Sequence, residues 1–416
     1  MRSVTDMKRY VIIGNSTAAI HAVEGIRSLD KEGTILLVSD ETHFTYGRPL
    51  ISYYLYGKTD EEHMKYRPSD WYEVNGVQTK LGVRAEKIDA KEKTVTLSTG
   101  ETVGYDKLLV ATGSRPFVPP MEGLDRVEQS YSFMTMDDAL RIERDFVKTD
   151  NVLVIGAGLI GLKCVEGILS RVNSVTAVDM ADRILPSILD EEGSRIVQTY
   201  LEGLGVKFCL SDSAVKFESN SATMKSGKTL SFDKLVLAVG VRANIELVKE
   251  AGGACERGIC CNEKQETSLA DVYAAGDCAI SHDITAGVDR VLALLPNAAF
   301  QGRTAGVNMA GGDVSFDQAI PMNAMGLFGL HMMTAGVYEG EVYKEHKDGN
   351  YKKLFCQDGV LKGFILIGDV SRAGIYTSLI RNRTPLCEVD FDLLKTRPQL
   401  AAFSKTYRRE NFTKEV

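Results

Sequence analysis

YVIIGNSTAAIHAVEGI, residues 10–26, and NVLVIGAGLIGLKCVEGIL, residues 151–169, are the two stretches that decide the fold of this chain. Each is a short apolar strand that runs through a glycine-rich turn into a helix, and the two begin about 140 residues apart. Each is followed by a second apolar strand that ends in an acid: TILLVSDE ends at Glu41 and SVTAVD ends at Asp179. A strand–turn–helix–strand unit with a trailing acid is typical of dinucleotide binding, so the repeat predicts two dinucleotide sites in an α/β fold.

The glycines are explained by the space that a diphosphate needs at the turn. The turn must be tight, and the diphosphate must reach the N–H groups at the positive end of the helix. Gly156, Gly158 and Gly161 fill all three positions of the second motif, whereas the first has Gly14 followed by Ser16 and Ala19. A turn of small residues is a common structural accident, so the first motif is weak alone and gains support from the second.

Composition limits the possible classes of protein. A chain of 416 residues predicts two or three domains, and its net charge of −7 gives no reason to expect nucleic acid or an anionic membrane as a partner. No apolar run is long enough to span a bilayer, and residues 1–9 lack the apolar core of a signal peptide, so we expect a cytoplasmic protein. The eight cysteines show no zinc-ligand spacing, so we expect reduced structural thiols and no metal site.

The order of patterns along the chain suggests an internal duplication followed by a further domain. An alternating meander and a buried strand follow each glycine unit, and KLLVATG at 107–113 is echoed by KLVLAVG at 234–240. A third buried strand, DVYAAGDCA, precedes a helix expected near Asn297–Ala310. From about Ile320 the sequence becomes rich in aromatic and glycine strand patterns. We therefore predict two Rossmann-like dinucleotide-binding domains and a C-terminal α+β domain.

Six motifs in order resemble one superfamily: GxSxxA at 14–19, YGRPL at 46–50, ATGSRP at 111–116, GAGLIG at 156–161, LAVG at 237–240 and YAAGD at 273–277. The chain is similar to the FAD-dependent pyridine nucleotide–disulfide oxidoreductases. RPLISYYL at 48–55 and GFILIGDVSRAGIYTSLI at 363–380 resemble the branch of NADH:rubredoxin oxidoreductases and nitrite reductase flavin modules. The resemblance implies FAD and NAD(H) as cofactors. It also implies an FAD domain at 1–118 and 240–319, an NAD domain at 119–239 and a C-terminal interface domain at 320–416.

The resemblance implies a role at FAD for a first set of residues. They are Gly14, Ser16, Thr17, Ala18, Ala19, Asp40, Glu41, Arg48, Pro49, Val83, Ala111, Thr112, Gly113, Gly276, Asp277 and Asn297. Glu41 is expected to accept from the hydroxyls of the adenosine ribose, with Asp40 as the neighbouring candidate. Arg48 and Pro49 are expected beside the flavin, and Asp277 at a ribityl hydroxyl. The helix that opens near Asn297 is expected to direct its positive end at the flavin ring.

A second set is expected at the nicotinamide dinucleotide: Gly156, Gly158, Ile160, Gly161, Asp179 and Gly240. A carboxylate at Asp179 accepts from a free 2′-hydroxyl and repels a 2′-phosphate, so NADH is preferred to NADPH. Arg183 follows four residues later and could meet a phosphate, which leaves the strictness of that preference open. Gly240 is expected to make room for the nicotinamide.

Two departures from the superfamily shape the expected chemistry. Disulfide reductases and peroxidases of the superfamily carry cysteine near the flavin, but HFTYGRPLISYYL at 43–55 contains none, so the flavin itself must release the electrons. Many relatives pair a lysine with a glutamate where this chain has Tyr53 and Lys163. Lys163 is therefore assigned a catalytic role as a cation near the flavin ring, against the alternative of an exposed helix lysine.

These observations lead to three functional hypotheses. The favoured one is an FAD flavoprotein that transfers electrons between NAD(H) and an iron–sulfur or rubredoxin-type protein, either as a free reductase or as a stable subunit of a larger complex. The second is an NADH oxidase that produces hydrogen peroxide. The third is a scaffolding subunit in which FAD is structural. The oligomeric state stays open.

Overall fold

The computed structural model describes residues 7–412. The expectation that residues 1–9 contain no signal peptide therefore falls mostly outside the described residues, because 1–6 are not among them. The chain divides into two compact units. The first takes in the described residues up to Ser187, then Ser194–Ser281 and Arg290–Asp317. The second takes in Ile188–Gly193, His282–Asp289 and the described residues from Gln318 onward. Over the described residues, no helix combines the length and the apolar character that crossing a membrane requires.

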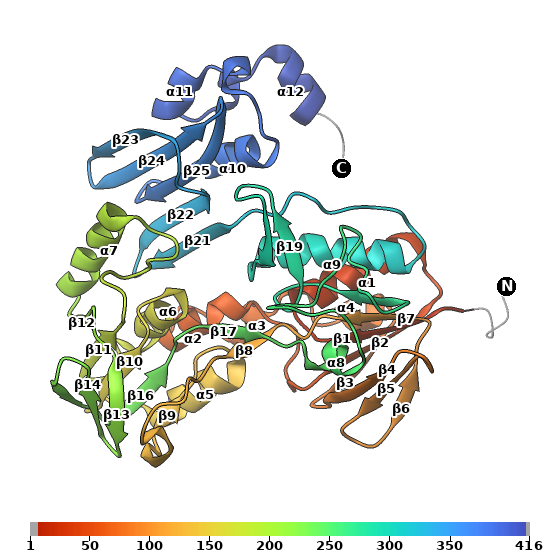
Figure 1. The fold of residues 1–416 in the computed structure, drawn as a ribbon, viewed down its shortest axis with the longest axis horizontal. Coiled ribbons are helices and arrows are strands. Elements are labelled where there is room, and N and C mark those ends of the chain that lie inside the picture. Colours follow the sequence, from red (N-terminus) through yellow and green to blue (C-terminus); the bar gives the residue numbers. More distant parts are fainter. Residues whose placement is uncertain (1–6, 413–416) are drawn as a thin grey trace. The chain divides into compact units, whose positions relative to one another are not determined.

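The first unit contains two parallel five-stranded sheets, and one of them has the strand order β18-β7-β1-β2-β3 (Figure 1). Its strands are β1 (Arg9–Ile13), β2 (Thr34–Ser39), β3 (Val77–Leu81), β7 (Lys107–Val110) and β18 (Val272–Ala274). Successive residues of a strand point to opposite faces. Ile12 accordingly packs with helices α1 (Thr17–Leu29) and α9 (Leu295–Met309), whereas Val11 and Ile13 pack with an antiparallel meander. The meander consists of β4 (Ala85–Asp89), β5 (Thr94–Leu97) and β6 (Thr102–Gly104).

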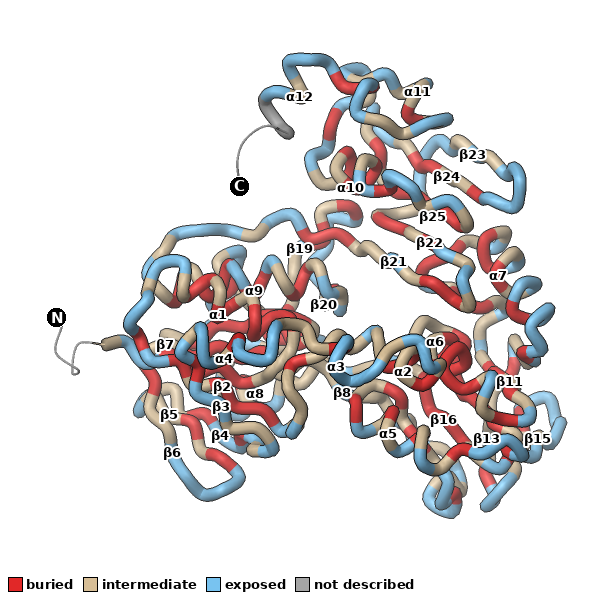
Figure 2. The backbone as a smooth tube through the Cα atoms, turned by 180° about the vertical axis from the view of Figure 1, so that it is seen from behind, coloured by how far each residue is buried: buried red, intermediate tan, exposed pale blue. Residues whose placement is uncertain are grey.

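The other parallel sheet repeats this plan with the strand order β12-β11-β10-β16-β9. Its strands are β9 (Ser130–Tyr131), β10 (Asn151–Ile155), β11 (Ser174–Val178), β12 (Lys207–Cys209) and β16 (Lys234–Leu237). Its helices are α5 (Met136–Asp145), α6 (Leu159–Ile168) and α7 (Glu191–Gly203), and its meander is β13 (Ala214–Glu218), β14 (Ser221–Met224) and β15 (Thr229–Ser231). Strand β16, next to the central strand β10, and much of α6 are buried, in red in Figure 2. The predicted duplication of a Rossmann-like unit is confirmed.

Two short strands join the halves of the first unit. β8 (Ser114–Pro116) leads out of the first sheet, and β17 (Val241–Ala243) leads back to it as its antiparallel partner. Helix α2 (Ile51–Tyr56) packs closely on α6, where a Cβ added at Gly167 would lie 3.0 Å from Leu55 Cβ. The remaining short helices of this unit are α3 (Glu61–Met64), α4 (Trp71–Val74) and α8 (Glu246–Glu250).

The second unit is built on an antiparallel sheet with the strand order β21-β22-β25-β24-β23. Its strands are β21 (Met322–Leu327), β22 (Leu330–Gly336), β23 (Glu341–Lys347), β24 (Asn350–Gln357) and β25 (Val360–Ile367). Helices α10 (Ala373–Arg381), α11 (Phe391–Thr396) and α12 (Lys405–Phe412) follow, and the core joins Phe364 of the sheet to Tyr376 and Leu394 of the helices. The predicted C-terminal α+β domain is confirmed.

The compact second unit also includes two segments that the sequence assigned elsewhere. Residues 188–193 fall within the expected NAD domain, and residues 282–289 within the expected second part of the FAD domain. Asp190 explains the first, because its carboxylate pairs with Lys353 Nζ at 2.6 Å and accepts from Tyr351 OH at 3.0 Å. The second belongs to the hairpin β19 (Ile280–Asp283) and β20 (Val288–Val291), whose Ile284 N–H donates to Ala319 O at 3.1 Å.

Candidate cofactor-binding cavity

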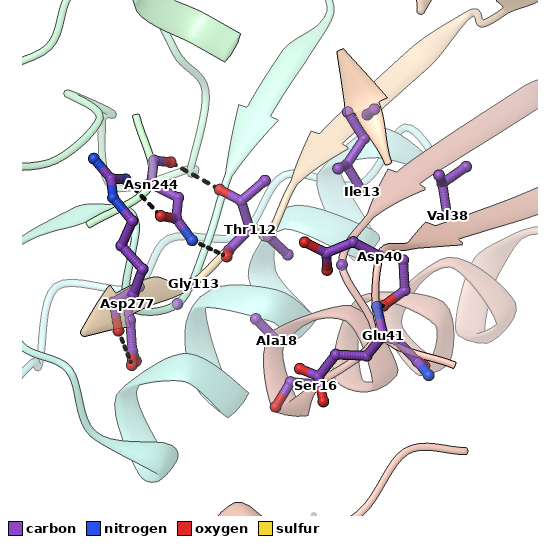
Figure 3. Close-up of a pocket in the computed structure, with 18 of the residues that line it drawn as sticks. Ile13, Ser16, Ala18, Val38, Asp40, Glu41, Thr112, Gly113, Asn244 and Asp277 are labelled. Carbon is purple, nitrogen blue, oxygen red and sulfur yellow. Dashed lines mark hydrogen bonds between the residues drawn. The ribbon is translucent and has the colours of Figure 1, made fainter. Parts of the chain in front are cut away.

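A cavity of about 800 Å³ opens beyond the carboxyl ends of strands β1, β2, β7 and β18 (Figure 3). Ligands of open α/β sheets bind at this edge, where neighbouring loops diverge. In Figure 3, Asp40 and Glu41 lie beside Ser16 and Ala18, whereas Thr112, Gly113 and Asp277 lie across the cavity from them. The volume is within the range of about 300–1,000 Å³ that is typical of cofactor pockets.

The turn between β1 and α1 presents backbone donors to this cavity. Gly14 has a φ of +122°, and a Cβ at this position would lie 2.1 Å from Ala111 O, so only glycine allows the two strands to approach this closely. Ser16 is the N-cap of α1, but its side chain makes no capping hydrogen bond. Thr17 and Ala18, the first two residues of α1, line the cavity, and N–H groups at the start of a helix are available to a phosphate.

Helix α9 begins at the same cavity because it packs against α1 at backbone contact. A Cβ at Gly302 would lie 2.1 Å from Ala18 O, and one at Gly306 would lie 2.0 Å from Ala22 O. The N-cap of α9 makes no side-chain hydrogen bond, and Leu295 of its first turn lines the cavity. Two uncapped helix N-termini therefore meet at one site, which favours a ligand that carries negative charge.

Asp277 supplies an acid on the other side of the cavity. Its carboxylate accepts from Ser114 Oγ at 3.3 Å. Burial raises the pKa of the Asp277 carboxyl, and this hydrogen bond and the positive charge of Arg48 act in the opposite direction. A carboxyl group in this position can bind a hydroxyl of a ligand.

Glu41 is engaged with protein groups. Its Oε1 forms an ion pair with Arg48 Nη2, and its Oε2 accepts from Tyr46 OH at 2.7 Å. Arg48 also donates from Nη1 to Met134 O at 3.2 Å. Asp40, the neighbouring acid, is exposed at the cavity wall. Glu41 was expected to bind the adenosine ribose, but in the structure both of its carboxylate oxygens already have a protein partner.

Most residues expected at FAD line this cavity. They are Gly14, Ser16, Thr17, Ala18, Asp40, Glu41, Arg48, Val83, Ala111, Thr112, Gly113, Gly276 and Asp277. Ala19, Pro49 and Asn297 are not part of its wall. Ala19 is on the buried face of α1 and Asn297 is buried in the first turn of α9, whereas Pro49 is exposed.

Asn244, Arg115 and Glu246 also line the cavity, and the sequence analysis did not identify them. Asn244 Nδ2 donates to Thr112 O at 2.9 Å, and Thr112 Oγ1 donates to Asn244 O at 2.8 Å. Arg115 pairs with Glu246 at 2.7 Å. The similarity of KLLVATGSRP and KLVLAVGVRA could have identified Asn244. The residues after the glycine of each segment pair as β8 and β17, and this pairing brings Asn244, which follows β17, to the cavity.

The second glycine turn has the same construction in the other sheet. Gly156 has a φ of +111°, and a Cβ on it would lie 2.2 Å from Ala238 O. A Cβ on Gly161 would lie 2.0 Å from Gly156 O, so the helix passes directly against the turn. Asp179 accepts from Ala157 N at 2.7 Å and from Ala181 N at 2.9 Å, one with each carboxylate oxygen. The acid thus holds the loop, and each oxygen keeps a second lone pair.

The other residues expected at the nicotinamide dinucleotide surround this turn. Gly158 is the N-cap of α6 and Ile160 is half-buried in its first turn. Gly240 has a φ of +114°, and a Cβ added there would meet no atom within 4 Å. Open space beside Gly240 is consistent with room for a ligand.

Lys163 is in α6, and its side chain packs toward Tyr53 of α2, so it is not an exposed helix lysine. Its side chain is 17% exposed and pairs with Glu166, which is 1% exposed. Its Nζ lies 4.1 Å from the centroid of the Tyr53 ring. Burial lowers the pKa of the Lys163 ammonium, and the Glu166 carboxylate opposes this effect. Lys163 is not among the residues described at the cavity wall.

The residues of the cavity fit FAD. Backbone donors at two helix ends suit the diphosphate, and acids on opposite sides suit the hydroxyls of a ribose and a ribityl chain. Gly113 has a φ of +64° and open space where a Cβ would stand, which leaves the wall accessible to a ring.

Comparison with known families agrees with this geometry. The model of the pyridine nucleotide-disulphide oxidoreductase family matches residues 8–302. The model of the rubredoxin NAD⁺ reductase C-terminal domain matches residues 321–384.

Curated relatives and solved structures resemble the chain over most of its length. The NADH-dependent phenylglyoxylate dehydrogenase subunit epsilon of Aromatoleum evansii is 32% identical over 91% of this chain and 92% of its own. The assimilatory nitrate reductase electron transfer subunit of Bacillus subtilis is 31% identical over 90% of this chain, which spans only 50% of that protein. The covalent putidaredoxin reductase–putidaredoxin complex has a TM-score of 0.86 at 25% identity, and the match covers 95% of this chain and 99% of that one. The chain therefore belongs to the pyridine nucleotide-disulphide oxidoreductase family, and FAD and NAD(H) are its cofactors.

Proposed function

We propose that this protein transfers electrons between NAD(H) and a one-electron protein partner of the iron–sulfur or rubredoxin type. FAD would occupy the cavity, held by residues of 1–118 and 240–319, and NAD(H) would bind at the second glycine turn in 119–239. Residues 320–416 would form the interface domain.

The observation that carries the proposal is the chemistry of the cavity wall, where the described residues include no cysteine. The neighbouring thiol, Cys278, is fully buried and its Sγ donates to Val110 O and Ala275 O, each at 3.4 Å. Burial raises the pKa of this thiol, and burial raises the pKa of Cys164 in α6 as well. A protonated, enclosed thiol is a poor nucleophile, so neither residue is suited to relay electrons.

Bound FAD would supply a ring that takes up two electrons with a hydride and releases them one at a time. The protein would contribute positioning and charge. The glycine turns and the N-termini of α1 and α6 would hold the two diphosphates, and Asp277 would fix the ribityl chain. Asp179 would favour NADH over NADPH by its charge. Lys163 would act from between α2 and α6 as a partly buried cation that makes the flavin easier to reduce.

The names of the relatives support a macromolecular partner. One is a subunit of an NADH-dependent dehydrogenase, one is an electron transfer subunit, and one was solved as a covalent complex with putidaredoxin. We therefore infer that the protein works either as a free reductase or as a stable subunit of a larger complex. We also infer a cytoplasmic location, which the eight free cysteines support because reducing compartments keep thiols unpaired.

Anaerobic stopped-flow mixing with NADH tests this function. Flavin absorbance should bleach rapidly and return rapidly when an oxidised iron–sulfur or rubredoxin protein is added, but only slowly in air. Cys278→Ala and Cys164→Ala should show the same electron-transfer rates as the wild type. Fast return in air alone would instead identify an NADH oxidase, and absence of bleaching would identify a scaffolding role. A cysteine variant that bleaches but no longer passes electrons to the protein acceptor would refute the direct route.

A further inference from the structure

A loop of irregular backbone, residues 179–190, connects strand β11 to helix α7. Connections from a strand to a helix in α/β folds are usually about 2–6 residues long, so this one is long and needs contacts that hold it. The loop begins at Asp179, the acid expected at NAD(H), and it ends at Asp190. Each of these two acids anchors one end of the loop.

The first end of the loop is bound to the second glycine turn. Asp179 accepts from Ala157 N at 2.7 Å and from Ala181 N at 2.9 Å. Farther along the loop, Leu185 N donates to Ala157 O at 3.0 Å. Ala157 is the middle residue of GAG at 156–158. The peptide groups on both sides of Ala157 are therefore bound to the loop, so the shape of the turn depends on where the loop lies.

The middle of the loop has a backbone conformation that needs support. Leu185 is fully buried and has a φ of +50°, in the left-handed region that leucine rarely adopts. Such a conformation persists only where surrounding contacts hold it. One of these contacts comes from the first residues of α7, where the buried Ser194 Oγ donates to Ile184 O at 2.8 Å. A displacement of the start of α7 would therefore displace the loop.

The second end of the loop is anchored on β24 of the C-terminal sheet. Asp190 Oδ2 pairs with Lys353 Nζ at 2.6 Å and accepts from Tyr351 OH at 3.0 Å. Its Oδ1 accepts from Gly193 N at 2.9 Å, in the first turn of α7. The side chains of Asp190 and Lys353 are only 19% and 20% exposed, so solvent screens this ion pair weakly. One carboxylate thus caps α7 and joins its first turn to the sheet.

Two further contacts hold the same segment, 188–193. Tyr338 OH donates to Ile188 O at 2.5 Å. A Cβ added at Gly193 would lie 3.3 Å from Ile367 Cδ1 of strand β25, so the backbone passes close to the sheet. The loop is therefore held at one end by the glycine turn and at the other by the C-terminal sheet.

We propose that Asp190, Lys353 and Tyr351 are positioning residues for NAD(H), which hold loop 179–190 against the second glycine turn. This inference rests on the proposed function, because it assumes that NAD(H) binds at that turn. It gives the C-terminal domain a role in the affinity for the nucleotide, through residues that do not touch it.

Anaerobic stopped-flow reduction of the FAD-loaded protein tests the inference, because the dependence of bleaching on NADH concentration separates the Kd for NADH from the limiting rate. Lys353→Met removes the charge and should raise this Kd by roughly 5–20-fold, with less than about a twofold change in limiting rate. Tyr351→Phe should act in the same direction with a smaller effect. Lys353→Arg retains the charge and should keep the Kd within about threefold of the wild type.

Lys352→Met is the matched control on the same strand. The Lys352 side chain is 17% exposed and pairs with Glu345 at 3.3 Å, and its Nζ donates to Lys395 O at 3.0 Å. Neither partner belongs to the loop, so this variant should weaken the C-terminal sheet and leave the Kd for NADH unchanged. A double-mutant cycle isolates the ion pair: Asp190→Asn should add less than about a twofold loss in a Lys353→Met background.

Limited digestion with trypsin gives a readout that does not depend on activity. Arg183 is the single arginine in residues 179–190, which contain no lysine, so cleavage after Arg183 reports release of the loop. Lys353→Met should be cut there faster than the wild type and Lys352→Met, as measured by mass spectrometry of the fragments. NAD⁺ should slow this cleavage.

An unchanged Kd for NADH in Lys353→Met would overturn the inference whatever the rate of cleavage, and so would an equal rise in Lys352→Met. The proposed function would stand in both cases. Flavin absorbance and thermal unfolding show whether each variant is folded, and Tyr351→Phe is judged by the same criteria if Lys353→Met is not. If NADH does not bleach the flavin of the wild type, the proposed function and the inference both fail.

Discussion

Replacing Gly302 with alanine tests whether backbone contact between α1 and α9 builds the cavity. The added Cβ would lie 2.1 Å from Ala18 O and 2.8 Å from the Ala18 carbonyl carbon. Ordinary contact begins at 3.4 Å, so the two helices must separate by 1.3 Å at this point. Ala18 lines the cavity, and Leu295 and Ala298 at the start of α9 line it too, so the separation displaces both helix ends.

Both stability and cofactor affinity should fall. Overfilling a packed contact costs about 1–3 kcal/mol, which lowers Tm by roughly 1–4 °C in a chain of this length. The N–H groups of α1 must stay within hydrogen-bond distance of a diphosphate, so loss of one such contact should weaken FAD by roughly tenfold or more. Differential scanning calorimetry and fluorescence titration of the flavin-stripped protein measure the two effects.

Gly203→Ala is the matched control, because it makes the same change at the end of helix α7 where a Cβ meets no atom within 4 Å. It should leave FAD affinity unchanged and raise stability by up to about 1 kcal/mol, since alanine is the better helix former. Gly306→Ala should reproduce the Gly302 effect, because its Cβ would lie 2.0 Å from Ala22 O. A Gly302→Ala protein with the Tm and FAD affinity of the wild type would show that the helices do not need this contact.

Three further predictions concern charge. Lys163→Glu should lower the flavin midpoint potential by about 30 mV, equivalent to about 1.4 kcal/mol for a two-electron couple, and an unchanged redox titration would contradict the role given to this cation. Asp179→Asn should raise KM for NADH by roughly tenfold with a smaller change for NADPH, because one hydrogen-bond acceptor and one repulsive charge are lost; equal losses for both nucleotides in steady-state kinetics would contradict it. The hydrogen bond from Lys107, followed by that from Lys93, lowers the pKa of Asp271, so this carboxylate stabilises the fold above its ordinary pKa of 3.8 and loses that effect as pH falls through the lowered value. Asp271→Asn, which suits the φ of +63° at this position, should therefore cost about 1 kcal/mol in urea unfolding at pH 7 and progressively less as the pH falls below 3.8, and a constant cost would point to packing instead.

Local sequence was sufficient to predict the two parallel sheets and the order of their strands and helices along the chain. The helix predicted near Asn297–Ala310 spans Leu295–Met309. The echoed segments KLLVATG and KLVLAVG contain equivalent strands, β7 and β16, and each pairs with the strand that leads into a glycine turn, β1 or β10. Thirteen of the sixteen residues that the family resemblance implied at FAD line one cavity. The strands and helices agree because each was predicted from a neighbouring strand, turn and helix, whose geometry is fixed within about thirty residues.

Contacts between segments far apart in the chain could not be predicted from local sequence. Asn244 reaches Thr112, 132 positions earlier, and Met134 O meets Arg48, 86 positions earlier. Each contact depends on how two elements cross in space, and no periodicity in either segment encodes that crossing. Residues 188–193 were likewise assigned to the surrounding domain, because Asp190 finds Lys353 only in the folded chain.

The sequence by itself determined the paired dinucleotide units and the lack of cysteine beside the expected flavin, since turn chemistry and residue identity are local properties. Only the tertiary structure distinguished Asp40 from Glu41, neighbours with the same charge at the end of one strand. The physical reason is that a carboxylate binds whichever donors the fold brings to it, and the donors to Glu41 come from Tyr46 and Arg48, which contacts at Met136 and Met134, far along the chain, hold in place.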